Sequence, residues 1–198
     1  NIARQIGERL PDRAPAFFFM DIQPHQVELF DKAVRAVAGT ENYQRVPTLR
    51  GRIVKIDGVP VAKRMIAQNS RWAVRGDRVL THMAAKPETA EIVAGSWWSK
   101  NYQGPPAISL DAGLARGFRV SVGDTLSFNI LGREITATIA SLREINWRSL
   151  RFDFAVIFAP GTLESAPQTH IAAIEAPVAV EDALEKAATD DFPNISAI

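Results

Sequence analysis

The sequence contains no cysteine, which excludes disulfide bonds, thiolate catalysis and cysteine-based metal sites. An oxidising compartment is compatible with this composition but is not required by it. The chain also lacks an apolar run of the roughly 18–20 residues that a transmembrane helix needs. Its longest run, Ala14 to Met20, has only the length of a strand, and residues 1–4 lack the basic-then-apolar order of a signal peptide.

An excess of charge of one sign is also missing. The chain has 23 basic and 22 acidic residues, for a formal net charge of +1. This balance does not favour nucleic acid or an acidic lipid surface as the main partner. The basic residues that follow position 49 are dispersed over a segment expected to contain strand and loop, so we predict no nucleic-acid partner. They are Arg50, Arg52, Lys55, Lys63, Arg64 and Arg71.

Sequence patterns of catalytic and metal sites are absent as well. The three histidines, His25, His82 and His170, are too scattered to form a ligand spacing. The nearest match to a serine-hydrolase elbow is Gly95-Ser96, but Trp98 stands where the second glycine belongs. We therefore predict no catalytic residue, no metal site and no enzyme activity.

A β-hairpin is the clearest pattern that is present. Thr125 to Ile130 alternates apolar and polar residues, and so does the segment from Ile135 to Ile139. Leu131-Gly132 between them is short enough to close a two-residue hairpin. Asp111 is placed to cap a short helix over residues 112–116 just before it. The module carries no catalytic residue on its turns, which favours a structural or contact role.

The order of elements at the two ends of the chain predicts the fold class. Near the start we expect a strand, a helix with an apolar stripe at 27, 30, 34 and 37, and an extended segment broken near Gly51. Near the end we expect a strand, a helix with Val180, Ala183, Leu184 and Ala187 inward, and a last strand. The prediction is an α+β fold: a split ferredoxin-like βαβ domain with a mainly β subdomain inserted over residues 74–164. The remaining expected elements are strands at 16–22, 44–56, 92–95, 108–110, 152–158, 170–175 and 194–198, and helices at 24–39 and 177–188.

Aromatic residues give the best candidates for a contact site. Trp97, Trp98 and Tyr102 cluster after a predicted strand, and exposed aromatics suit an apolar ligand, a partner or a membrane interface. We also expect one of the two tryptophans to pack in the β core instead. A second candidate contact group is Trp147, Arg148 and Arg151.

An ordered set of motifs resembles a known family, and it covers nearly the whole chain. The chain resembles the extracytoplasmic, MacB-like periplasmic core domain of ABC transporter permeases of the FtsX/MacB/LolC type, and looks closest to the YbbP-like branch. The motifs are residues 49–53 (LRGRI), 72–77 (WAVRGD), 95–98 (GSWW), 123–126 (GDTL) and 143–149 (REINWRS).

The resemblance implies a domain arrangement. A Porter-like α+β subdomain would comprise residues 14–73 and 165–198, and a β-rich Sabre-like subdomain would comprise residues 74–164. Residues 1–13 would be a stalk helix that follows a transmembrane span. A further span would follow Ile198.

The resemblance also implies a location, partners and a function. The chain would be a non-catalytic periplasmic domain of a bacterial inner-membrane permease that relays ATP-driven motion to a periplasmic protein or a lipid-like substrate. Its partners would include the permease's own transmembrane helices and a separate cytoplasmic subunit that binds ATP. No cofactor is expected here, since no G-x-x-x-x-G-K-[ST] sequence occurs. The alternatives are a free-standing periplasmic binding or adaptor module and, with less support, a soluble hydrolase.

Overall fold

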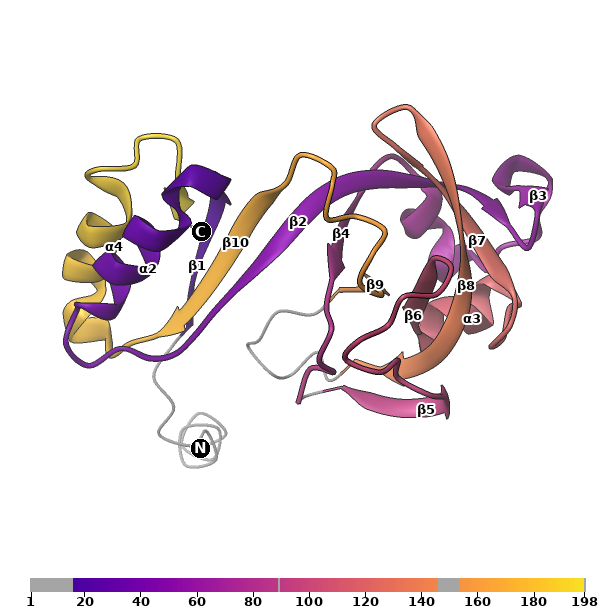
Figure 1. The fold of residues 1–198 in the computed structure, drawn as a ribbon, viewed down its shortest axis with the longest axis horizontal. Helices are drawn as coiled ribbons and strands as arrows, with labels where there is room; N and C mark the ends of the chain where they lie inside the picture. Colours follow the sequence, from indigo (N-terminus) through magenta and orange to yellow (C-terminus); the bar gives the residue numbers. More distant parts are fainter. Residues whose placement is uncertain (1–15, 89, 146–153, 198) are drawn as a thin grey trace, which may run out of the picture. The chain divides into compact units, whose positions relative to one another are not determined.

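The computed structural model describes residues 16–88, 90–145 and 154–197 (Figure 1). Its elements are sheet-rich with few helices, which confirms the α+β class. The chain divides into two compact units, residues 1–46 with 169–198, and residues 47–168. The second unit is therefore inserted in sequence between the two segments of the first.

The first unit is built on strands from both ends of the chain. Strand β1 (Ala16–Ile22) pairs antiparallel with β10 (Thr169–Glu175), with Phe17 opposite Ile174. The short strand β11 (Ser196–Ala197) flanks β1 on its other edge, and β2 (Glu41–Ile56) follows β10 in the strand order.

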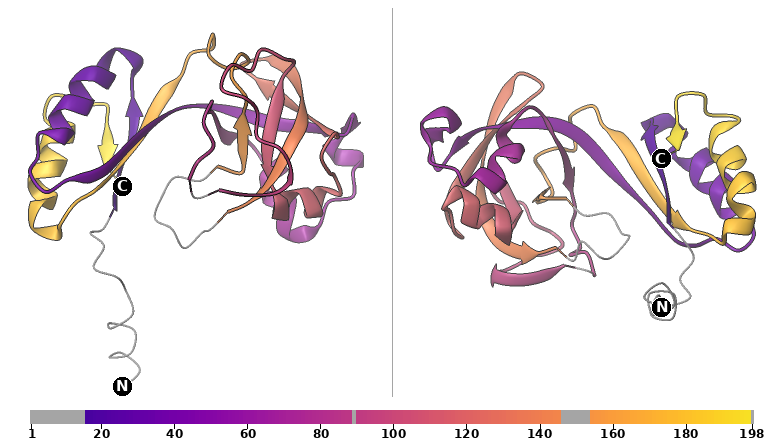
Figure 2. Two further views of the ribbon diagram at one scale, coloured as in Figure 1. Left: turned by 60° about the horizontal axis from the view of Figure 1, so that its bottom comes forward. Right: turned by 180° about the vertical axis from the view of Figure 1, so that it is seen from behind.

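Two helices, α2 (Val27–Arg35) and α4 (Glu181–Thr189), lie side by side on one face of these strands (Figures 1 and 2). A 3₁₀ turn precedes each helix, η1 (Pro24–Gln26) and η4 (Val178–Val180).

Phe30 lies at the centre of the apolar core of this unit. Its ring centroid is 5.6 Å from that of Phe19 and 5.8 Å from that of Phe192, both with edge-to-face geometry. Phe30 and Val34 are fully buried, as the helical stripe predicts. Ala183, which we expected to face inward, is exposed. The helix begins at Glu181 rather than near Pro177, and Leu184 and Ala188, four residues apart, form its buried face.

A polar network joins α2, β2 and β10 within the first unit. Arg45 donates to both carboxylate oxygens of Asp31, at 2.9 and 3.0 Å, and the Tyr43 hydroxyl donates to the same carboxylate. Arg45 Nη1 lies 2.9 Å from His170 Nδ1. Because a guanidinium can only donate, His170 Nδ1 is the acceptor of this bond.

This network shifts the acid–base properties of its members. Partial burial opposes ionisation of Asp31, but the hydrogen bonds from Arg45 and Tyr43 outweigh it and hold the pKa of that carboxyl below its ordinary value. Burial, followed by the hydrogen bond to Asp31, raises the pKa of Tyr43. The network is therefore at full strength when Asp31 is ionised.

The second unit contains most of the strands. β2 pairs with β4 and β7 there, and the order continues from β4 through β9, β6 and β8 to β5. Two of the pairings, β4 with β9 and β6 with β8, are parallel. The elements are β3 (Val59–Pro60), β4 (Arg78–His82), β5 (Glu91–Gly95), β6 (Ala107–Asp111), α3 (Ala112–Phe118), β7 (Thr125–Ile130), β8 (Arg133–Glu144) and β9 (Val156–Phe158), with the 3₁₀ segments η2 (Val61–Lys63) and η3 (Gln68–Val74).

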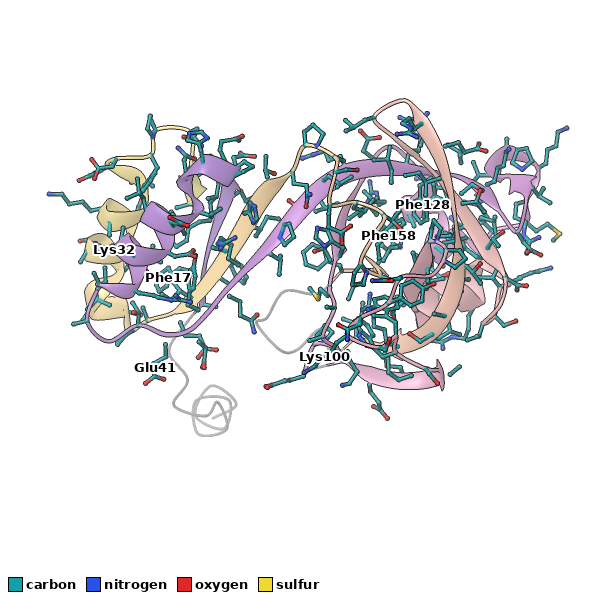
Figure 3. The ribbon with its side chains drawn as sticks, viewed as in Figure 1. Phe17, Lys32, Glu41, Lys100, Phe128 and Phe158 are labelled. Carbon is teal, nitrogen blue, oxygen red and sulfur yellow. The ribbon has the colours of Figure 1, made fainter. Side chains whose placement is uncertain are left out.

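The predicted hairpin is confirmed as β7 and β8. Leu131 and Gly132 both have positive φ, 51° and 81°, as a type I′ turn requires. The alternating apolar residues of β7 are buried, and the Phe128 ring meets that of Phe158 at 5.0 Å between centroids (Figure 3). The Asp111 cap is confirmed too, because its Oδ2 accepts from the Leu114 N–H at 2.9 Å.

Two sequence-based expectations about strands differ from the structure. β2 runs unbroken past Gly51, where a Cβ would lie 2.7 Å from Leu80 Cδ1 and 2.9 Å from Ile130 Cγ1. The glycine thus permits close packing and does not interrupt the strand. The strand expected over 152–158 is shorter, with β9 covering only its last residues, and residues 152–153 lie outside the described part of the chain.

The division between the units also differs from the expected boundaries at residues 73/74 and 164/165. It falls at Val46/Pro47 and at Gln168/Thr169. The second half of β2 pairs with β4 and β7, with Gly51 opposite Arg78 and Ile53 opposite Phe128. These ladders place residues 48–56 of β2 in the inserted unit. The expected stalk, residues 1–13, lies outside the described residues.

We predict that acid weakens the first unit through Asp31. A carboxylate with a lowered folded-state pKa stabilises the fold above its unfolded pKa of about 3.9, and this stabilisation is lost as pH falls through the folded value. Urea unfolding followed by far-UV circular dichroism should show the free energy of unfolding falling below about pH 4. Asp31→Asn should flatten that fall and cost about 1 kcal/mol at neutral pH. Asp191→Asn, which removes an exposed carboxylate of the same unit, is the control, and an equal effect from it would contradict the assignment.

Candidate functional site

The predicted aromatic group forms a hydrogen-bonded pair in the second unit. The Trp97 and Trp98 rings lie 4.2 Å apart between centroids at an interplanar angle of 37°. Trp97 Nε1 donates to the Ala84 carbonyl at 2.9 Å, and Trp98 Nε1 donates to the Met83 carbonyl at 2.8 Å. Both indoles are thereby tied to the segment that follows β4.

Only part of this group is available for contact. Trp98 is 8% exposed, so it is the tryptophan that packs inside, whereas Trp97 is half-buried. Tyr102 is also half-buried, and its hydroxyl donates to the Pro105 carbonyl at 2.6 Å. The other predicted contact residues, Trp147, Arg148 and Arg151, lie outside the described residues.

Gly95 sets the path of the chain into the tryptophan pair. It has a φ of 69°, and a Cβ there would lie 2.2 Å from the Ala140 carbonyl oxygen. No other residue fits so close to the neighbouring strand backbone. The β5 edge, and with it the position of Trp97, therefore depends on this glycine.

A second feature of the same unit is a cavity of about 480 Å³ formed by η2, η3 and the C-terminal end of α3. The close packing of η3 on α3 brings two walls of this cavity together. Gly117 is the last residue but one of α3 and has no room for a side chain. A Cβ there would lie 1.8 Å from Ser70 Oγ and 2.4 Å from Ser70 Cβ. The Ala67 N–H donates to the Gly117 carbonyl at 3.0 Å, which fixes the two walls together.

Arginine dominates the lining of this cavity. No aspartate or glutamate from the described ranges lines it. Other basic side chains of the unit do meet acids: Lys55 lies 3.1 Å from Glu134, and Arg52 lies 3.8 Å from Asp77. The cavity therefore gathers positive charge with no carboxylate in its described lining. The arginines are Arg64, Arg71, Arg75, Arg116 and Arg119.

Backbone carbonyls hold some of these side chains in place. Arg64 Nη2 donates to the carbonyls of Phe118 and Arg119, both at 3.2 Å. Arg71 Nε makes a longer bond of 3.5 Å to the Ile66 carbonyl. Cations near the carbonyl end of a helix are favoured by its exposed C=O groups. These contacts explain the positions of Arg64 and Arg71. They do not explain why five arginines and no described carboxylate line the cavity.

Arg119 occupies a backbone position that normally belongs to glycine. It ends α3 with φ 57° and ψ 46°, in the left-handed region. The next residue, Val120, closes the end of the helix with an N–H bond to the Ala115 carbonyl at 3.0 Å. A side chain with a Cβ costs roughly 1–2 kcal/mol in this conformation. The chain thus places an arginine at the cavity at the expense of local strain.

Sequence reasoning missed this cavity. It treated the basic residues as dispersed, and Arg64 and Arg71 were among them. The available signal was local: Arg71 and Arg75 stand four residues apart in the sequence, and Arg116 and Arg119 three apart. What joins the two pairs is the packing at Gly117, which no local pattern reveals.

The described part of the chain gives no indication of a metal centre. Within residues 16–88, 90–145 and 154–197, no group of three or more His, Asp or Glu side chains is placed to hold a metal ion. Across the same residues, none of the helices has both the length and the apolar character needed to cross a bilayer.

Comparison with known proteins gives the relationship. No protein-family profile matches the chain. A protein of Escherichia coli strain K12, named "Uncharacterized ABC transporter permease YbbP", is 32% identical over 162 residues, which is 82% of this chain. The chain belongs to this permease family. It spans about a fifth (19%) of the length of that relative.

Among solved structures, the chain is similar to a domain assigned to a permease protein of Porphyromonas gingivalis. The TM-score is 0.40 with 13% sequence identity, over 93% of this chain and 90% of that one. At this level of similarity we draw no conclusion about the fold from it.

We predict that Gly117→Ala destabilises the second unit, because the new methyl group would overlap Ser70. Overpacking of this kind costs about 1–3 kcal/mol. All four tryptophans of the chain lie within residues 47–168, so their fluorescence during urea unfolding reports on this unit. Gly113→Ala, in the same helix but with its nearest neighbour at 3.1 Å, is the control. Equal stability of the two variants would refute the close contact.

We predict that Arg119→Gly stabilises the same unit by about 1 kcal/mol, because it relieves the left-handed strain. Arg119→Ala removes the side chain but keeps the strain, so it should change the free energy of unfolding little. The same fluorescence-monitored titration measures both. If the alanine variant gained as much stability as the glycine variant, charge repulsion and not backbone strain would be the cause.

Proposed function

We propose that the chain is the extracytoplasmic domain of an ABC transporter permease. The observation that carries the proposal is its 32% identity to an ABC transporter permease over 82% of its length. The absence of a membrane-spanning helix from the described residues is compatible with a domain exposed on one side of the membrane. In the complete protein, transmembrane helices of the permease and a cytoplasmic ATPase subunit would be its partners, with ATP bound by that subunit.

The two-unit organisation supports a finer version of the proposal. The unit made from both chain ends would be the Porter-like subdomain next to the membrane, and the inserted unit would be the Sabre-like subdomain. One uninterrupted strand, β2, contributes residues to both units. The first unit would receive ATP-driven displacement from the membrane helices and the inserted unit would contact a periplasmic partner or a lipid-like substrate. Trp97 and Tyr102 are the predicted contact residues on that unit.

The environment of His82 supports a non-catalytic role. His82 bonds Gln168 at 2.8 Å and lies 3.5 Å from Glu164, while His170 accepts from Arg45. These contacts hold the His82 ring to an amide and a carboxylate, whereas a hydrolase needs a histidine bonded to its nucleophile. A histidine hydrogen-bonded to a serine hydroxyl would have favoured the hydrolase alternative.

The location can be tested by labelling in intact bacterial cells. The chain has no cysteine, so a single Lys100→Cys change at an exposed position introduces one defined thiol into it (Figure 3). A bulky charged maleimide that does not cross the inner membrane should label Cys-substituted full-length permease without lysis of that membrane. A cysteine in the ATPase subunit, labelled only after lysis, is the control. Labelling of position 100 only after lysis would reject an extracytoplasmic location.

A further inference from the structure

We propose that the arginine-lined cavity of the second unit binds the phosphate headgroup of an anionic amphiphile. This inference deepens the proposed function and rests on it, since it assigns a substrate class to a domain next to a membrane. The cavity, formed by η2, η3 and the end of α3, is separate from the Trp97/Trp98 pair in sequence and in lining residues.

The charge of the cavity favours an anion. Five arginines line it, and no described carboxylate shares the lining. Guanidinium groups remain charged at all physiological pH values, so they cannot relieve their mutual repulsion by losing protons. A phosphate offers several oxygen acceptors, and the planar N–H fork of arginine matches them in pairs. A phosphomonoester carries close to two negative charges and a phosphodiester carries one. The phosphomonoester can therefore pair with more of the five arginines.

The remaining lining of the cavity is apolar. Val61, Ile66 and Val74 are half-buried in its wall and pack against the core, and Met65 is 69% exposed at the same place. The volume, about 480 Å³, is in the range of small-molecule sites and exceeds the needs of one inorganic phosphate. A ligand with a phosphate at one end and a hydrocarbon chain at the other would contact both parts of the lining.

Two features indicate that the cavity is built and not incidental. Arg119 lies in a left-handed backbone conformation that glycine would adopt with less strain, and its side chain lines the cavity. Gly117 allows the contact with Ser70 that brings the arginines of η3 beside those of α3. Arg119→Gly would relieve the backbone strain but remove one cation of the site, whereas a larger residue at Gly117 would clash with Ser70.

The balance of the whole chain distinguishes this site from general attraction to membranes. The net charge is only +1, so long-range attraction to any acidic surface is weak. Five of the 23 basic residues nevertheless line this one cavity. Binding should therefore depend on particular arginines and not on the total charge of the protein.

The test uses the purified 198-residue chain and vesicles of phosphatidylcholine with or without phosphatidic acid, in a co-sedimentation assay. Arg71→Gln and Arg75→Gln each remove one exposed cation from the cavity, and Arg133→Gln removes one exposed cation from β8. Arg75→Lys keeps the charge but loses the planar fork. Inorganic phosphate, titrated by calorimetry, is the arm without a hydrocarbon chain. Thermal unfolding checks that every variant is folded.

We expect binding to vesicles that contain phosphatidic acid, and about tenfold weaker binding for Arg71→Gln and for Arg75→Gln. Arg133→Gln should bind like the parent chain, and Arg75→Lys should fall between the parent and Arg75→Gln. Inorganic phosphate should bind more weakly than the lipid.

Three results would overturn the inference. They are no binding to phosphatidic acid, an equal loss for Arg133→Gln, and inorganic phosphate that binds as tightly as the lipid, which would make the ligand a free anion. None of them bears on the labelling of position 100. Failure of the headgroup site is therefore distinguishable from failure of the proposed location.

Discussion

The second half of β2 is the constraint on which the inserted unit depends. From residue 47 onward the strand must stay extended so that its backbone can pair with β4, β7 and β3 in turn. Buried backbone groups that lost such partners would each cost about as much as a broken hydrogen bond. Gly51 makes the run possible, because Leu80 and Ile130 pack where its side chain would stand. The core around Phe128 and the walls of the cavity are assembled against this strand.

The arginine cavity shows how a nearly neutral chain can concentrate positive charge at one place. Lys55 and Arg52 lie near acids, and their charges are partly offset. The arginines of η3 and α3 have no such acids in the cavity lining of the described structure. The close packing of two short helical segments at Gly117 brings these charges together. The positive charge of the site therefore depends on the absence of a side chain at Gly117. The net charge of the chain does not reveal this local concentration of arginines.

Local sequence patterns predicted the elements whose information is local. The hairpin of β7 and β8, the Asp111 cap and the buried stripe of α2 depend on alternation, turn residues and helical spacing, and all are confirmed. Gly51 was misjudged because its role depends on residues that reach it only in the tertiary fold. The cavity was missed for the same reason, since the contact of Gly117 with Ser70 joins segments that no periodicity connects. Of the aromatic site, the sequence predicted the cluster and one inward tryptophan, but not that carbonyls of residues 83 and 84 would hold both indoles.

The antiparallel pairing of β1 with β10 has a consequence for biosynthesis. Residues 16–22 pair with residues 169–175 on one edge, and β11, which comes still later in the chain, pairs with the opposite edge of β1. A ribosome releases the inserted unit in full before it releases either of these C-terminal partners. The strands of the inserted unit can therefore all pair before the C-terminal segment is synthesised. At that stage β1 still lacks its partner strands, and Phe30 lacks its contact with Phe192. The first unit is therefore the part whose strand partners are the last to be synthesised.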